Sequence, residues 1–277
     1  MTSTGKISRS STGTRISRLF ERLRAQGRPA LIGYLTAGDP SLERTPALIE
    51  ALERGGVDLI ELGVPFSDPI ADGPVIQRAS ERALRAGATL QKILALAAAI
   101  RQRSEIPLLL FSYLNPVLRY GLEAAASRAA AAGVDGFLLT DLSVEEAEVY
   151  LPALRAHQLD TVFLAAPTST EARLKLVAEH SSGFIYLVSR TGVTGERERL
   201  SESIEPLIRI MRRLSELPLA VGFGISRPEH VAALAKLADA VVVGSAFVRL
   251  IERFGSQPSL ETELESLARA LRQACEG

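Results

Sequence analysis

The sequence predicts a single α/β domain folded as a (β/α)8 TIM barrel, with an extra N-terminal helix and additional short helices. Eight short apolar segments alternate with longer amphipathic segments along the chain, which is typical of parallel strands that helices bury on both faces. The length of 277 residues also lies close to the roughly 250 residues common for one such barrel. The alternation alone leaves an open doubly wound sheet as the alternative.

The N-terminal part predicts a tail and then a helix. Residues 1–14 are rich in Ser and Thr, and we expect a disordered tail there, followed by one catalytic domain over residues 15–277. From Arg15 to Gln26 the apolar residues lie on one stripe at helical spacing, which predicts the extra helix. The predicted strands then follow as Ala30–Leu35, Asp58–Leu62, Leu108–Phe111, Gly136–Leu139, Thr161–Ala165, Phe184–Val188, Leu219–Gly222 and Ala240–Val243.

Helical periodicity fills the segments between these strands. The predicted helices are Ser41–Arg54, Ile76–Arg103 with a break near Gly87, Gly121–Ala132, Val144–His157, Thr170–Glu179, Ser201–Ser215, Arg227–Leu237, Ala246–Phe254 and Ser259–Cys275. No Pro-, Gly- or Ser-rich linker divides the chain, so we expect one domain.

Composition excludes several classes of function. The 32 basic and 32 acidic residues cancel, so net charge gives no reason to expect nucleic acid or an anionic membrane as a partner. No apolar run reaches the roughly 20 residues of a membrane span. Cys275 is the single cysteine, which suits a reducing cytoplasm. His157, His180 and His230 have no second ligand at metal-binding spacing, so we expect no metal site.

A carboxylate-rich segment, Glu61–Gln77, follows the second predicted strand. Side chains alternate along a strand, so Leu59 and Glu61 share one face, and that face puts a carboxylate at the barrel mouth if it lines the interior. Asp68 and Asp72 follow in a loop to which prolines and glycines give a defined shape. These carboxylates suit acid–base chemistry. The alternatives are that the aspartates are turn residues and that Glu61 is paired structurally.

Three further strand ends carry unusual loops. Ser189–Leu200 has two glycines, several charges and no apolar stripe, which predicts either a lid that closes over the site or an ordinary surface loop. Val221–Ser226 and Val241–Val248 are strand–glycine–turn sequences at the seventh and eighth strands. Glycines before a helix N-terminus at this position commonly bind substrate phosphate in barrels. We therefore expect a phosphorylated substrate, unless these glycines only allow tight turns.

At these same residues the sequence closely resembles the tryptophan synthase α subunit family. The segment ELGVPFSDPIADGP from Glu61 to Pro74 resembles the family signature almost throughout. The other matching segments follow in the family's order: LTAGDP (Leu35–Pro40), NP (Asn115–Pro116), AAPTST (Ala165–Thr170), SRTGVTG (Ser189–Gly195), GFGIS (Gly222–Ser226) and VVGSA (Val242–Ala246). The resemblance extends from about Arg15 to the C-terminus.

The resemblance implies a lyase of tryptophan biosynthesis that cleaves indole-3-glycerol phosphate to indole and glyceraldehyde 3-phosphate in a retro-aldol reaction. It implies no metal or organic cofactor in this chain. Glu61 resembles the general acid that protonates the indole ring at C3 and helps to remove the glycerol hydroxyl proton. Asp72 resembles the group that binds the indole N–H and stabilises the cationic intermediate. One group must donate a proton while the other stays anionic, so we expect their environments to differ.

The resemblance also assigns binding residues. It matches Gly195, Gly224, Gly244 and Ser245 to the phosphate-binding positions, and it matches Tyr113, Tyr186 and Phe223 to the surroundings of the indole and its glycerol chain. Thr194 matches the lid residue that meets the catalytic aspartate on closure. The sequence departs from the family in two places. Tyr34 stands where some members have phenylalanine beside the indole, and DLSVEE (Asp141–Glu146) lacks a proline pair often seen there.

A partner is implied as well. Family members bind a pyridoxal-phosphate β subunit in an α2β2 heterotetramer and pass indole to it through an internal tunnel. The loop Pro65–Pro69, with Asp68, and the region after Asn115 resemble the parts that face this partner. The alternatives are a free-standing indole-3-glycerol-phosphate lyase, a non-catalytic activator of the β subunit, and another phosphate-binding barrel such as an isomerase of the tryptophan or histidine pathways.

Overall fold

The chain forms one sheet of parallel strands. A computed structural model describes residues 13–188, 197–222 and 224–276, with side chains described throughout these ranges except in residues 197–203. The strands are β1 (Ala30–Thr36), β2 (Leu59–Gly63), β3 (Leu108–Ser112), β4 (Gly136–Leu139), β5 (Asp160–Val162), β6 (Leu164–Ala165), β7 (Ile185–Val188), β8 (Leu219–Gly222) and β9 (Ala240–Val243). They lie in the order β5-β4-β3-β2-β1-β9-β8-β7-β6.

The sheet closes into a barrel through its fifth predicted strand. β5 pairs with β4 and β6 pairs with β7, and only Phe163 separates β5 from β6. The carbonyl oxygen of Phe163 accepts the N–H of Tyr186 at 3.1 Å. The two ends of the sheet are therefore one continuous segment of chain, and the eight predicted strands are confirmed, with the fifth divided in two.

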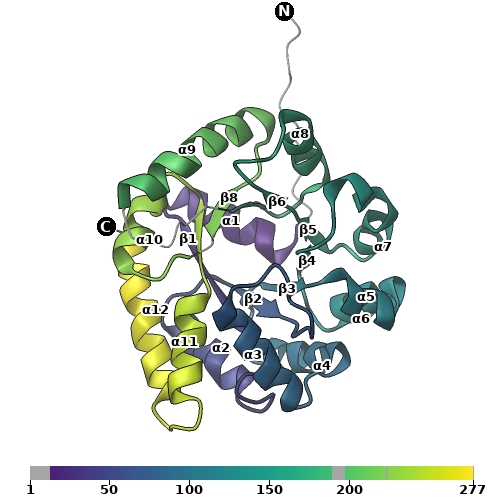
Figure 1. The fold of residues 1–277 in the computed structure, drawn as a ribbon, viewed down its shortest axis with the longest axis vertical. Helices are drawn as coiled ribbons and strands as arrows, with labels where there is room; N and C mark the ends of the chain where they lie inside the picture. Colours follow the sequence, from purple (N-terminus) through teal and green to yellow (C-terminus); the bar gives the residue numbers. More distant parts are fainter. Residues whose placement is uncertain (1–12, 189–196, 223, 277) are drawn as a thin grey trace, which may run out of the picture.

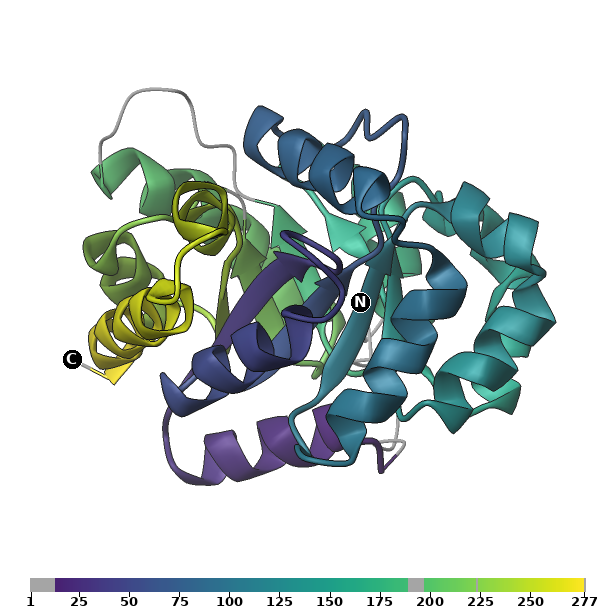
Figure 2. The same ribbon diagram turned by 90° about the horizontal axis from the view of Figure 1, so that it is seen from below.

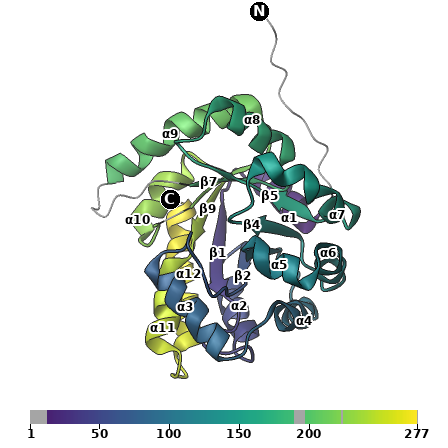
Figure 3. The same cartoon turned by 45° about the vertical axis from the view of Figure 1, so that its right-hand side comes forward.

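Helices surround this barrel (Figures 1 and 3). They are α1 (Arg15–Ala25), α2 (Thr45–Arg54), α3 (Pro74–Arg85), α4 (Leu90–Arg101), α5 (Leu114–Tyr120), α6 (Leu122–Ala131), α7 (Leu151–Ala156), α8 (Glu171–His180), α9 (Arg197–Leu214), α10 (Pro228–Ala235), α11 (Ser245–Phe254) and α12 (Leu260–Glu276), with a 3₁₀ helix η1 (Val144–Val149) before α7. The predicted break near Gly87 is confirmed. This glycine has a φ of +78°, which favours glycine.

Two helical segments differ from the prediction. The helix predicted over Val144–His157 is wrong as a single element, because η1 ends at Val149 and α7 begins at Leu151. Pro152 lies in the first turn of α7, and it has no N–H to continue a helix that arrives from η1. α5 was not predicted. It carries Pro116 in its first turn, where proline is tolerated.

α1 closes one end of the barrel. Its residues Ile16, Leu19, Phe20 and Leu23 belong to the same buried cluster as inward-facing strand residues such as Leu59. Ile60 and Leu62 instead pack in the outer cluster with the surrounding helices. The predicted alternation along this strand is therefore confirmed. Figure 2 shows α1 lying across one end, while α3 rises at the opposite end.

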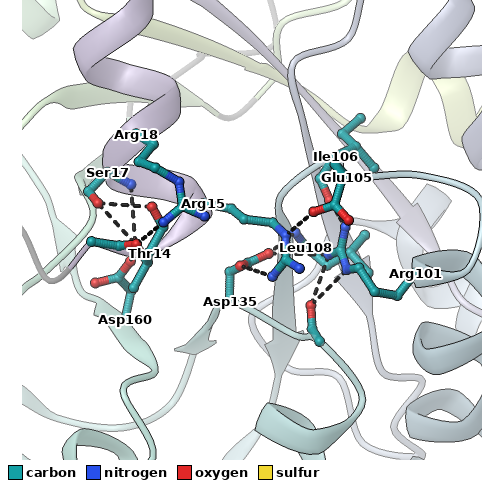
Figure 4. A network of polar contacts seen from close by, with 12 residues as sticks. Thr14, Arg15, Ser17, Arg18, Arg101, Glu105, Ile106, Leu108, Asp135 and Asp160 are labelled. Carbon is teal, nitrogen blue, oxygen red and sulfur yellow. Dashed lines mark hydrogen bonds and ion pairs between the residues drawn. The ribbon is translucent and has the colours of Figure 1, made fainter.

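Aspartates fasten the strands at the end near α1. Each of three aspartates precedes a strand, donates its backbone N–H to the carbonyl of one leucine in the adjacent strand, and accepts that leucine's N–H at 2.7–2.9 Å. The pairs are Asp58 with Leu31, Asp135 with Leu108, and Asp239 with Leu219. An arginine pairs with each carboxylate, respectively Arg272, Arg101 and Arg212. Figure 4 shows Asp135 between Arg15 and Arg101.

In the described parts of the chain, no single helix is both long and apolar enough to cross a membrane. α3 and α4 reach that length and hydropathy only as a pair, and the pair is bent by 94°.

Candidate active site

A cavity of about 400 Å³ opens where the barrel strands end, which lies within the usual size range of ligand pockets. It brings together residues that are far apart in the sequence. Its described wall consists of Tyr34, Glu61, Asp72, Gly73, Pro74, Ile76, Phe111, Tyr186, Gly224, Ile225, Val242, Gly244 and Ser245. The carboxylate segment and both glycine turns therefore meet in one site.

Glu61 is a buried carboxyl group in the floor of this cavity. Its exposed fraction is 1%, and its Oε1 has no hydrogen-bond partner among the described residues. Burial alone raises the pKa of Glu61 to about 8, because the ionised form loses its hydration. Glu61 is therefore protonated at neutral pH and can donate a proton to a molecule in the cavity.

Asp72 occupies a wetter position at the start of α3. Burial raises the pKa of Asp72 to about 6, and a hydrogen bond from Tyr113 opposes that rise. The hydroxyl of Tyr113 also accepts the N–H of Ala71 at 2.9 Å. The two carboxyl groups therefore differ as expected, since near pH 7 Asp72 is mostly ionised and Glu61 is mostly protonated.

Tyr34 forms the wall beside Glu61. Its ring meets Phe111 edge to face, with 5.2 Å between the ring centroids, and its hydroxyl lies 3.1 Å from Oγ1 of Thr36. A Cβ atom at Gly63 would lie 2.4 Å from this hydroxyl, so the glycine provides the space that the tyrosine needs. Burial is the main cause that raises the pKa of Tyr34, and the phenol stays neutral.

Tyr186 is accommodated in the same way across the barrel. A Cβ atom at Gly222 would lie 2.0 Å from the Tyr186 hydroxyl, so any side chain there would displace the tyrosine. Burial raises the pKa of Tyr186, and the charge of Glu61 adds to the effect. Glu61 therefore lies beside two phenols that stay neutral, and the described wall offers no cation to stabilise its ionised form.

The two glycine turns also form part of the cavity wall. Gly244 is the N-cap of α11 and Ser245 is its first residue, so the first backbone N–H groups of α11 have no partner within the helix. A Cβ atom at Gly244 would lie 3.2 Å from Cβ of Tyr34, and Gly224 has a φ of +72°, which favours glycine. Unpaired N–H groups and the helix dipole together suit an anion such as phosphate.

The structure places the sequence-predicted residues in three groups. Tyr34, Tyr186, Gly224, Gly244 and Ser245 lie in the cavity wall with Glu61 and Asp72. Tyr113 is not part of the wall among the described residues, and it contacts the site through Asp72. Thr194, Gly195 and Phe223, together with the predicted lid, lie wholly or mostly outside the described residues.

Sequence reasoning missed several apolar residues of the wall. Phe111 and Val242 each follow an inward-facing strand residue by two positions, so strand alternation could have identified them. Ile76 comes from the first turn of α3, where no such alternation applies. Among the described residues, no group of three or more His, Cys, Asp or Glu side chains could hold a metal ion.

Comparison with known proteins gives one consistent answer. The family model for the tryptophan synthase alpha chain matches residues 20–276. A tryptophan synthase alpha chain of Solibacter usitatus is 66% identical over 260 residues, which cover 94% of this chain and 97% of the relative. One from Geotalea uraniireducens is 54% identical and covers 87% of this chain and 90% of the relative.

Solved structures agree with the sequence relatives. Tryptophan synthase subunit alpha from Legionella pneumophila superposes with a TM-score of 0.88 at 36% identity, over 95% of this chain and 98% of that chain. A chain of Mycobacterium tuberculosis tryptophan synthase superposes with a TM-score of 0.85 at 40% identity, over 94% and 98% of the two chains.

Proposed function

The chain belongs to the tryptophan synthase alpha chain family, and from this premise we propose how its residues carry out the reaction. It is a lyase of tryptophan biosynthesis that cleaves indole-3-glycerol phosphate to indole and glyceraldehyde 3-phosphate. The observation that supports our assignment best is the pair of carboxyl groups with different pKa values in one cavity.

The reaction needs a proton on the indole ring before the carbon–carbon bond breaks, because an aromatic carbanion is a poor leaving group. Protonated Glu61 donates its proton to C3 of the indole. The positive charge then lies largely at N1, where ionised Asp72 binds the N–H and stabilises the cation electrostatically. Near pH 7 the pKa values of about 8 and about 6 put each group in the state that its role requires.

Bond cleavage completes the cycle. The Glu61 carboxylate takes the proton of the hydroxyl on the carbon bonded to C3. The electrons of that C–C bond return to the ring as the aldehyde of glyceraldehyde 3-phosphate forms. One proton is given and one is taken, so Glu61 ends in its starting state. In our proposal this chain needs no metal or organic cofactor, because the acid and the anion supply the chemistry.

We assign the substrate phosphate to the glycine side of the cavity. Gly224, Gly244 and Ser245 supply backbone N–H groups there, and the N-terminus of α11 favours negative charge. Tyr34 and Tyr186, which line the same cavity, contact the indole and the glycerol chain in this assignment. Gly195 and Phe223 extend the binding site, and Thr194 meets Asp72 when the lid closes, by resemblance to the family.

A β subunit is the partner in this proposal, in an α2β2 assembly in which pyridoxal phosphate belongs to that partner. Three exposed apolar side chains support a docking face. Ile70, Leu118 and Val149 have exposed fractions of 88%, 46% and 73%. They follow β2, β3 and β4, which are neighbours in the barrel. Substitution of Leu118 by Asp is expected to weaken co-elution with a β subunit while the isolated chain keeps its cleavage rate.

The roles of the two carboxyl groups are tested by Glu61→Gln and Asp72→Asn, with Asp68→Asn as the control from the same loop. We expect each of the first two variants to lose about 10²–10⁴ in cleavage rate and to bind glycerol 3-phosphate as before. The control should keep both properties, because Asp68 is exposed and lies outside the described wall. Near-normal cleavage by Glu61→Gln would overturn the assignment of the proton donor.

A further inference from the structure

The loop that presents Asp72 is fastened at several backbone positions. The N–H of Asp72 donates to the carbonyl of Pro69 at 3.1 Å, and the N–H of Ile70 donates to the carbonyl of Asp68 at 2.9 Å. These two short turns fold residues 68–72 into a compact arc. The hydroxyl of Tyr113 accepts the N–H of Ala71 and also hydrogen-bonds to the Asp72 carboxylate. The carboxylate is thus positioned through its own main chain.

Gln77 fastens the same arc from the opposite side. It lies in the first turn of α3, where its backbone N–H donates to the carbonyl of Gly73 at 3.0 Å. Its side-chain Nε2 donates to the carbonyl of Asp72 at 2.9 Å and lies 3.4 Å from the carbonyl of Pro69. A primary amide carries two N–H donors, so one side chain can bind both carbonyl groups of the arc.

Gln77 also faces away from the cavity. It lines an outer groove of about 300 Å³ between the loop and α3, together with Phe66, Ser67, Asp68, Pro69, Ile70, Glu81 and Leu84. Asp72 belongs to the wall of the inner cavity. Gln77 therefore lies between the outer groove and Asp72, which lines the inner cavity.

We propose that Gln77 is a positioning residue that holds Asp72 in its working geometry. The inference rests on the proposed function of Asp72. Without the amide, the carbonyl group of Asp72 loses its side-chain donor and the carbonyl group of Pro69 keeps only the N–H of Asp72. The arc is then held only by its internal turns and Tyr113. A misplacement of about 1 Å can cost about 10²-fold in rate. The phosphate end of the site lies on other strands and should not respond.

The pH dependence of the reaction should also respond to the position of the arc. The hydrogen bond from Tyr113 lowers the pKa of Asp72. If the arc shifts away from Tyr113, that contribution weakens and the pKa rises above about 6. The acid limb of the pH–rate profile would then move to higher pH. A residue needed only for folding would lower the amount of active enzyme without moving this limb.

The test compares Gln77→Met with Glu81→Met in the isolated full-length chain. Glu81 lies one turn later in α3 and lines the same groove, so it controls for effects on the helix and the groove. We expect Gln77→Met to lower kcat by about 10–100-fold and to move the acid limb upward by about half a pH unit. Binding of glycerol 3-phosphate should change by less than about twofold. Glu81→Met should match the parent in all three.

Unchanged kcat and an unmoved acid limb in Gln77→Met would overturn the inference, as would a parallel loss of glycerol 3-phosphate binding. If Gln77→Met does not fold, Gln77→Leu also removes the donors, adds no charge beside Asp72 and carries the same expectations. Asp72→Asn is measured alongside. Near-normal cleavage by that variant would remove the proposed role of Asp72 itself, whereas an inactive Asp72→Asn with a normal Gln77→Met refutes only the role of Gln77.

Discussion

The two ends of the barrel use carboxyl groups in opposite ways. At the end near α1, Asp58, Asp135 and Asp239 each bind a backbone N–H and an arginine. At the other end, Glu61 and Asp72 form no ion pair among the described residues, and burial raises the pKa of both. One end therefore fixes strand positions with paired charges, whereas the other keeps two carboxyl groups unpaired and reactive.

The largest expected effect is the loss of stability when one of the paired aspartates near α1 is removed. Asp135 has an exposed fraction of 5% and binds Arg101, Arg15 and the N–H of Leu108. Asp135→Ala removes the acceptor of the Leu108 N–H and the buried carboxylate that Arg101 and Arg15 share, and we expect a loss of about 3–5 kcal/mol in the free energy of unfolding. Chemical denaturation measures it, and kcat per folded molecule should stay the same.

Glu105→Ala is the control for that variant, because Glu105 is the exposed carboxylate on the same Arg15. We expect it to cost less than about 1 kcal/mol. Equal losses in the two variants would mean that burial does not distinguish these ion pairs.

The next largest effect is the decrease in the free energy of unfolding that the buried, unpaired Glu61 causes at higher pH. The pKa of Glu61 is about 8 in the fold against an ordinary value of 4.5 for a glutamate in water, so between these values the folded state holds more protons than the unfolded state. The free energy of unfolding then falls as pH rises through this window. Glu61→Gln removes the titration, so at about pH 8 it should be more stable than the parent by a few kcal/mol.

Denaturation at about pH 5 and at about pH 8 checks this expectation. The advantage of Glu61→Gln over the parent should be small at the lower pH and should grow towards the higher pH. An advantage that does not change with pH would show that Glu61 does not titrate in this window.

A third prediction uses the reaction itself. The pH dependence of kcat/KM should be bell-shaped, because the active form has an ionised Asp72 and a protonated Glu61. Asp72 is mostly ionised above about pH 6, and Glu61 is mostly protonated below about pH 8. In Asp72→Asn the residual activity should lose the acid limb and keep the basic limb. Loss of the basic limb in that variant would reverse the two assignments.

The smallest expected effect tests the tyrosine wall. Tyr34→Phe removes a hydroxyl whose described partner is Thr36 and keeps the ring against Phe111. We expect stability to change by about 1 kcal/mol and kcat/KM to change less than tenfold. A loss comparable to that of Glu61→Gln would make the phenol part of the reaction.

Sequence reasoning predicted the fold well wherever periodicity was strong. The apolar strand segments and the apolar stripe of α1 predicted the types and the order of the elements. Strand alternation predicted that Glu61 faces the barrel interior, in agreement with the structure. Short elements were harder, because Pro152 restarts a helix that periodicity alone would continue. The divided fifth strand was not foreseen, since its two halves pair with different neighbours on either side of Phe163.

The sequence predicted which residues form the candidate site better than it predicted their burial and their contacts. Motifs indicated Glu61 and Asp72, and chemistry required that they differ. Only the fold shows that Glu61 is buried beside the neutral phenols of Tyr34 and Tyr186. The role of Gln77 could not be read from sequence, because an amide in a first helical turn has no distinctive pattern. Its two carbonyl partners appear only when the loop is folded.

The most direct test of this account is a pH titration of the Glu61 carboxyl group itself. The titration is monitored by infrared difference spectroscopy, with Glu61→Gln as the reference for the parent protein. We predict a protonated carboxyl band at neutral pH that disappears with a midpoint near pH 8. A midpoint near the ordinary glutamate pKa of 4.5 would mean that Glu61 is already ionised at neutral pH, and it would contradict the assignment of this residue as the proton donor.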